Sequence, residues 1–137
     1  LIIIVIAYGH HVKIYLVLRP GKENIFHDID AVQSIIFSDD VFKESPAWWA
    51  EKCKDIDIVL HLAWYAEHGK YWTSPLNDKW AEATLKLVEA FCNSGGQGVI
   101  AAGTCAEYDW SHGYCREEAT LIKPETLYGQ AKDKTRK

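Results

Sequence analysis

The chain has 137 residues, 48% of them apolar and 25% charged, which predicts one globular domain with a core of its own. Its net charge of -4 at pH 7 argues against a nucleic-acid or membrane-surface partner, because both require a basic footprint. The four cysteines lie far apart in the sequence, which predicts no metal site and free thiols in the reducing cytoplasm.

Strands and helices are predicted to alternate along the chain. The apolar run at 1–7 (LIIIVIA) has strong β character and is too short to span a bilayer. Buried strands are predicted at 14–18, 31–37, 57–64 and 98–104, and helices at 46–54, 75–93 and 126–137. This alternation indicates an α/β fold with a mainly parallel sheet covered on both faces. Ligands of such sheets bind beyond the carboxyl ends of the strands, so side chains there are site candidates.

The closing helix carries a tyrosine and a lysine four residues apart. Tyr128 and Lys132, in the stretch TLYGQAK, project from the same face of a helix. The pair alone carries little information, because both residue types are frequent enough in this chain to produce the spacing by chance. The surrounding sequence has to decide whether the pair is functional.

Three sequence blocks and the spacing between them resemble one enzyme family. The stretch DIVLHLAW (57–64) is similar to D-x-V-x-H-x-A-A, and GTCAEY (103–108) to S-S-[ST]-x-x-x-Y-G. The stretch EEATLIKPETLYGQAK (117–132) is similar to E-x-x-x-x-x-P-x-x-x-Y-x-x-x-K. These are motifs of the extended short-chain dehydrogenase/reductases, the NAD-dependent epimerase/dehydratases that act on nucleotide-activated sugars. The resemblance covers about residues 9–137 and implies a single, partial Rossmann-like NAD(P)-binding domain over 1–137.

The resemblance implies a catalytic set of Tyr128, Lys132 and Thr104. A phenol ordinarily ionises near pH 10, so a tyrosine base at neutral pH needs its anion stabilised by about 4 kcal/mol, part of which a nearby ammonium supplies. Thr104 would hydrogen-bond the substrate oxygen that gains or loses the proton. The cofactor would take or give hydride at the adjacent carbon of a nucleotide sugar.

The resemblance also implies cofactor contacts at the strand ends. The implied cofactor-binding residues are Arg19, Asp40, Val41, Ala63, Trp64 and Lys132. Arg19 stands where a basic residue favours NADP and an acidic one NAD, so NADP is favoured over NAD. Trp64 is bulkier than the family's usual alanine and is expected to reshape the pocket of the nicotinamide ribose.

Other side chains near these motifs have simpler interpretations. His61 lies inside a predicted strand and is expected to be a buried structural histidine. Cys105 is not expected to be a nucleophile, because no strained G-x-C-x-G turn surrounds it. His68, Tyr71 and Trp72 either line a sugar pocket or cover the sheet.

The sequence departs from the family in three places. The family's first strand leads into a G-x-x-G-x-x-G loop that holds the pyrophosphate, and no such loop is present. LIIIVIA either replaces that strand, forming a hairpin with 14–18, or falls on the last turns of the helix after the loop. Family members continue for over a hundred residues beyond the lysine, so the substrate lobe is expected to be missing. Trp80 replaces the asparagine that often begins the long helix's N-x-x-G-T pattern, which puts a water relay in doubt.

Two functional classes therefore stay open. The first is an NAD(P)-dependent epimerase, dehydratase or reductase acting on a nucleotide sugar. The second is a truncated, non-catalytic Rossmann-like domain that serves as a weak nucleotide binder or an assembly module. Family dimers pack the long helix and the Tyr-Lys helix into a four-helix bundle, so we expect a homodimer or a higher homo-oligomer in either class.

Overall fold

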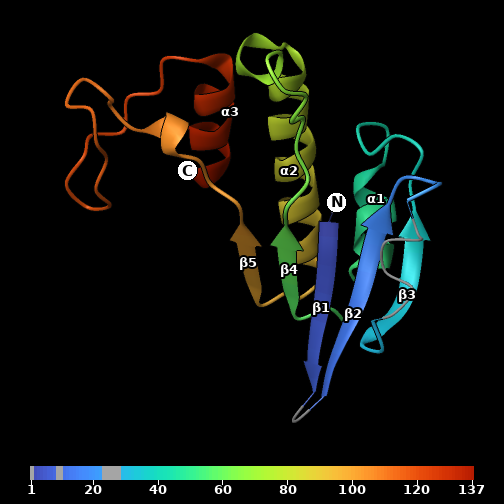
Figure 1. Ribbon diagram of the computed structural model, residues 1–137. Helices are drawn as coiled ribbons and strands as arrows, with labels where there is room; N and C mark the ends of the chain where they lie inside the picture. Colours follow the sequence, from blue (N-terminus) through green and yellow to red (C-terminus); the bar gives the residue numbers. More distant parts are fainter. Residues whose placement is uncertain (1, 9–10, 23–28) are drawn as a thin grey trace. The chain divides into compact units, whose positions relative to one another are not determined.

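The computed structural model describes residues 2–8, 11–22 and 29–137 (Figure 1). Contacts divide the chain into two compact units, the first made of 1–63 and 86–101 and the second of 64–85 and 102–137. In the described residues, no helix is long and apolar enough to cross a membrane.

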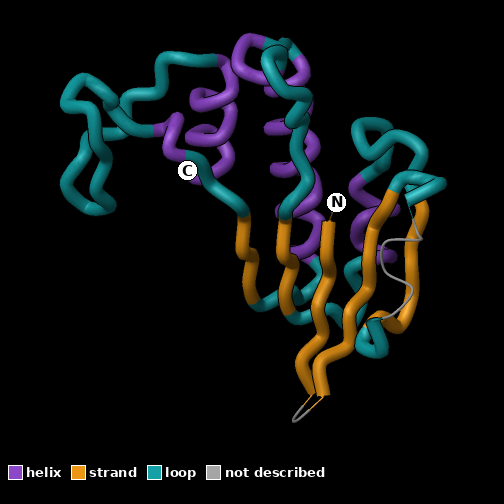
Figure 2. The backbone as a smooth tube through the Cα atoms, in the orientation of Figure 1, coloured by secondary structure: helices purple, strands orange, loops and turns teal. Residues whose placement is uncertain are grey.

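The first unit contains a five-stranded sheet in the order β3-β2-β1-β4-β5 (Figure 2). Its strands are β1 (Ile2–Tyr8), β2 (His11–Leu18), β3 (Val32–Phe37), β4 (Ile58–His61) and β5 (Gly98–Ala101). The pairs β2–β3 and β4–β5 are parallel, whereas β1 runs antiparallel to both β2 and β4. Four strands therefore share one direction and the central strand alone opposes them. This confirms the predicted α/β fold with a mainly parallel sheet.

The hairpin of β1 and β2 decides between the two alternatives for LIIIVIA. Only two residues separate the strands, and their register runs from Ile2 opposite Val17 to Tyr8 opposite His11. The apolar run is thus a strand that replaces the family's first strand in the reverse direction. Gly9 and His10, the two residues between these strands in the sequence, lie outside the described residues.

Two helices connect the parallel strands. Helix α1 (Pro46–Lys52) follows β3, and Ser45 caps its first turn by accepting a hydrogen bond from the backbone N–H of Trp48 at 3.1 Å. Helix α2 (Leu76–Asn93) joins β4 to β5. Right-handed crossovers in the same direction along a sheet place both helices on the same face, as Figure 1 shows for α1 and the second half of α2. Within the first unit, α1 and the second half of α2 thus form one helical layer on the sheet.

The core of the first unit lies between the sheet and these helices. Its fully buried side chains include Leu16, Val59, Trp49, Leu87 and Phe91. The turn after α2 closes against this core at Gly96, where any Cβ atom would overlap the ring of Phe91. Burial of these large apolar side chains, each contributing about 1.5–3 kcal/mol, supplies the main stabilisation of the unit.

Both predicted strands that lead to the site end three residues earlier than expected. The ladder between β4 and β5 stops at the pair His61–Ala101, so the next residues leave the sheet without a backbone partner strand. His61 is 2% exposed, which confirms the prediction of a buried histidine.

Candidate catalytic site

The second unit is built around α3 (Leu127–Arg136), which carries the predicted Tyr-Lys pair. Thr126 caps this helix by accepting a hydrogen bond from the backbone N–H of Gly129 at 3.1 Å. Tyr128 is half-buried and Lys132 is buried, so the face that they share is turned towards the protein. Lys132 therefore does not lie on a solvated helix face.

A glycine lets α3 approach the segment that carries Thr104. A Cβ atom at Gly129 would overlap the carbonyl oxygen of Ala106, which lies in the short 3-10 helix η3 (Cys105–Glu107). Only glycine permits this close contact between helix and backbone. Because Thr104 is the N-cap residue of η3, the contact brings the threonine and the Tyr-Lys helix into one packed substructure.

Lys132 is held by a backbone carbonyl and an aromatic face. Its Nζ donates a hydrogen bond to the carbonyl oxygen of Ala102 at 2.7 Å and lies 4.0 Å from the ring centroid of Trp64. Burial lowers the pKa of Lys132 from 10.5 to about 8, and the Glu107 carboxylate partly opposes this effect. The cation–π contact also favours the charged form, so the ammonium persists at neutral pH despite its burial.

Thr104 is the N-cap residue of a capping box with Glu107. The sequence contains the signal for this motif, but the motif was not predicted. Its hydroxyl oxygen accepts a hydrogen bond from the backbone N–H of Ala106 at 3.3 Å, and its own N–H donates to Oε1 of Glu107 at 2.8 Å. The T-x-x-E spacing of Thr104 and Glu107 is the usual signal for this motif. Since a hydroxyl used as an acceptor still has its hydrogen to donate, the Thr104 side chain retains a donor for a ligand.

Aromatic rings surround Tyr128 on several sides. Its ring lies edge-on to those of Tyr71 at 4.9 Å, Trp72 at 5.7 Å and Trp64 at 6.4 Å between centroids. Tyr71 and Trp72 belong to the 3-10 helix η2 (Tyr71–Thr73), which packs against α3. The aromatic side chains of this loop therefore contact the tyrosine of the candidate site.

Asn77 is a site residue that the sequence interpretation missed. It is fully buried, and its Oδ1 accepts a hydrogen bond from Nε1 of Trp64 at 2.9 Å. Its amide nitrogen donates to the carbonyl oxygens of Tyr71 at 2.6 Å and Ser74 at 2.9 Å. One amide thus fixes both the indole above Lys132 and the loop beside Tyr128. An asparagine near a helix start ordinarily indicates a cap, so nothing in the sequence marked this role.

The other predicted cofactor residues belong to the first unit. Arg19, Asp40 and Ala63 follow β2, β3 and β4, whose common direction places them at the same edge of the sheet. Arg19 is exposed and Ala63 is buried, while Val41 is half-buried. The Asp40 carboxylate accepts a hydrogen bond from the backbone N–H of Phe42 at 3.2 Å, which stabilises the turn after β3.

The described residues fit the two ends of a dinucleotide cofactor differently. Near Tyr128, the Lys132 ammonium has three donors and uses one on Ala102, so it retains hydrogens for the hydroxyls of a ribose. At the pyrophosphate end the fit fails, because β1 runs antiparallel to β2 and only two residues of sequence separate the two strands. No described helix follows β1 to present its N-terminus to phosphate. The donor set therefore suits the nicotinamide half alone.

Comparisons with known proteins agree with this architecture. The family model for the NAD dependent epimerase/dehydratase family matches residues 16–135. Among solved structures, the UDP-N-acetylglucosamine 4-epimerase from Bacillus cereus superposes with a TM-score of 0.58 at 18% sequence identity, over 88% of this chain and 46% of the epimerase. The chain thus spans less than half of that structure, and the likeness establishes the fold. A search of curated proteins found no match. Because the family model covers most of its length, the chain belongs to the NAD dependent epimerase/dehydratase family, which implies a nicotinamide cofactor.

Proposed function

We propose that this chain carries the catalytic side chains of an NAD(P)-dependent enzyme that epimerises, dehydrates or reduces the sugar of a nucleotide-activated sugar. The supporting observation is the substructure in which a buried Lys132, the half-buried Tyr128 and the Thr104 N-cap are packed together by Gly129. A solvated helix surface would not require a glycine at this contact or a buried ammonium.

The proposed chemistry assigns one role to each side chain. Tyr128 takes the proton from a sugar hydroxyl as the hydroxyl carbon becomes a carbonyl, and returns it in the reverse step. The Lys132 ammonium, one helical turn away, stabilises the Tyr128 phenolate that accepts this proton, and the transfer leaves a neutral phenol. Thr104 donates its hydroxyl hydrogen to the same sugar oxygen. A bound nicotinamide cofactor, for which the basic Arg19 favours NADP, would supply the hydride chemistry.

The substrate class can be tested with the longest expressed protein that contains this chain. It would be incubated with NAD or NADP and a panel of UDP-, dTDP-, GDP- and CDP-sugars, and the products separated by anion-exchange chromatography with mass analysis. We expect conversion of at least one nucleotide sugar, and a faster rate with NADP than with NAD. Absence of conversion across the panel, with a folded protein, would count against the proposed activity.

A second candidate function is favoured by the reversed central strand. With β1 antiparallel and no helix after it, the described residues offer no phosphate cradle, so this chain alone would be a weak nucleotide binder or an assembly module. Exposed apolar side chains on the first unit, including Val12, Phe37, Leu62 and Ile100, favour association into a homodimer or a larger oligomer.

Titration with NADPH tests whether this chain by itself binds the cofactor weakly. The chain has six tryptophans, one of which lies over Lys132, so cofactor binding should quench its fluorescence. We expect no saturation in the micromolar range for residues 1–137 by themselves. Saturable quenching at micromolar NADPH would contradict the argument from the reversed strand.

A further inference from the structure

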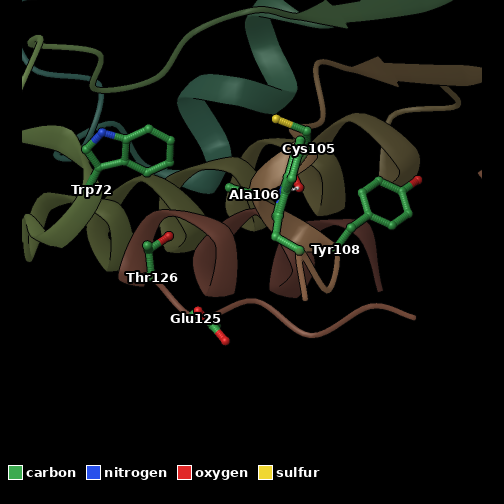
Figure 3. A pocket seen from close by; sticks show the side chains of 7 residues that line it. Trp72, Cys105, Ala106, Tyr108, Glu125 and Thr126 are labelled. Atoms are coloured by element: carbon green, nitrogen blue, oxygen red, sulfur yellow. Dashed lines mark hydrogen bonds between the residues drawn. The ribbon is translucent and has the colours of Figure 1, made fainter. Parts of the chain in front are cut away.

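A cavity of about 220 Å³ lies in the second unit, and its lining includes Cys105 and Thr126, which are near the candidate catalytic residues in the sequence. Two tryptophans and four residues with polar side chains line it: Trp72, Trp110, Cys105, Tyr108, Glu125 and Thr126. In Figure 3, Trp72 and Tyr108 lie on opposite sides of Cys105 and Ala106, with Thr126 and Glu125 below them. The lining thus combines large flat apolar surfaces with hydroxyl and carboxylate groups, the usual composition of a small-molecule site.

The two indoles are exposed but held in place. Trp72 is 40% exposed and Trp110 is 50% exposed, which is unusual for side chains that gain most from burial. Nε1 of Trp110 donates a hydrogen bond to the carbonyl oxygen of Cys105 at 2.9 Å. The ring of Trp72 contacts that of Tyr71, with 4.4 Å between centroids. Because both rings are already ordered, a ligand that stacks on them loses little free energy in fixing their positions.

The polar groups favour a neutral ligand that carries hydroxyls. Thr126 accepts the capping hydrogen bond from Gly129, so its hydroxyl hydrogen remains for a ligand oxygen. The exposed Glu125 carboxylate accepts hydrogen bonds and repels anions. Since none of the lining residues is a lysine or arginine, phosphate and carboxylate groups are disfavoured here. A pyranose ring has this chemistry, because its C–H faces are apolar and its edge is ringed with hydroxyls.

Some residues that line the cavity are sequence neighbours or ring contacts of the candidate catalytic residues. Cys105 directly follows Thr104, and Thr126 precedes Tyr128 by two residues. The ring of Trp72 also contacts Tyr128. We propose that this cavity binds a neutral pyranose ring by stacking on Trp72 and Trp110, and that Glu125 selects against sugars that carry a carboxylate. The proposal deepens the proposed function and rests on it for the identity of the sugar as substrate.

Binding of simple glycosides tests the proposal without cofactor or turnover. The probes are methyl β-D-glucopyranoside, N-acetylglucosamine and methyl β-D-glucuronide, titrated against the whole chain and followed by tryptophan fluorescence and saturation-transfer NMR. We expect saturable binding of the two neutral sugars and about tenfold weaker binding after Trp110→Ala, the loss typical of an aromatic anchor. Trp48→Phe, on α1 of the first unit, is the matched control and should bind as the wild type does.

Glu125→Gln provides a test that does not depend on removing an indole. Glu125 is exposed, so the substitution should keep the fold, and it removes the negative charge. We expect the variant to bind the glucuronide at least about fivefold more tightly than the wild type does, a modest loss of repulsion near the surface. Equal binding of glucoside and glucuronide to the wild type would overturn the proposal, as would saturation that Trp110→Ala leaves unchanged.

These experiments test sugar binding in the cavity and the proposed enzyme activity independently of each other. Sugar binding in the cavity without conversion of any nucleotide sugar would support the cavity and count against the enzyme. Conversion of a nucleotide sugar by a protein whose Trp110→Ala variant retains the wild-type KM would support the enzyme and overturn the cavity assignment.

Discussion

Replacing Lys132 by methionine should change how the stability of the fold depends on pH. Burial lowers the pKa of Lys132 to about 8, whereas in the unfolded chain it has its ordinary value of 10.5. Below pH 8 the folded protein holds a buried charge, and the full cost of burying it lowers the free energy of unfolding. Between pH 8 and 10.5 the unfolded chain binds more protons than the folded one, so the free energy of unfolding rises with pH.

The size of the effect follows from these two pKa values. At about 1.4 kcal/mol for each pH unit between them, the buried charge costs the folded state about 3 kcal/mol at neutral pH. About 2 kcal/mol of this should be recovered between pH 7 and pH 9.5. Lys132→Met cannot titrate, so it should lack this rise, whatever it loses from the bond to Ala102 and the contact with Trp64.

Urea unfolding at several pH values, followed by circular dichroism, measures the difference. The wild type should gain about 2 kcal/mol relative to Lys132→Met between pH 7 and pH 9.5. Lys134→Met is the matched control, because this lysine is on the same helix and exposed, and it should keep the wild-type rise. A stability difference between wild type and Lys132→Met that stays constant over this range would refute the assignment of a buried, titrating ammonium.

Three further substitutions or reactions test the packing around the site. Gly129→Ala should lower the free energy of unfolding by about 1–3 kcal/mol in urea titrations, because its Cβ would overlap the Ala106 carbonyl; an unchanged value would show that α3 does not approach η3 so closely. Asn77→Ala should cost about 1–3 kcal/mol and change the emission of Trp64, since it leaves the indole N–H and two carbonyls without their buried partner; unaltered stability and emission would contradict that role. Burial raises the pKa of the Cys53 thiol to about 11, so mass spectrometry after brief alkylation at pH 8 should find it unmodified while the exposed Cys92 reacts; equal modification of both would argue against the buried placement.

The alternating pattern of apolar runs predicted the fold because each run has a clear length and boundary. The helix at 75–93 was predicted to within one residue of α2, since its apolar residues recur on one face and Gly95 follows its end. The direction of β1 was harder to predict, because a strand has the same apolar pattern in either direction. Its short connection to β2 was the one signal that favoured a hairpin over a crossover.

The candidate site was predicted in part, for a different reason. Tyr128, Lys132 and Thr104 were found through motif spacing, which records which residues share a site but not what fills the space between them. The position of Trp64 over Lys132 and the buried amide of Asn77 arise from side-chain packing across elements distant in sequence. Such contacts depend on three-dimensional complementarity, which a single sequence does not display.

The central claim is that Tyr128 moves the proton in a reaction on a nucleotide sugar, and one kinetic measurement tests it most directly. The value of kcat for Tyr128→Phe should be compared with that of the wild type on the nucleotide sugar identified from the panel. Phenylalanine keeps the ring that contacts Tyr71 and Trp72, so the fold and KM should change little. We expect kcat to fall by about 100-fold or more, as for the loss of a general acid–base group. A kcat within a few-fold of the wild type would contradict the account.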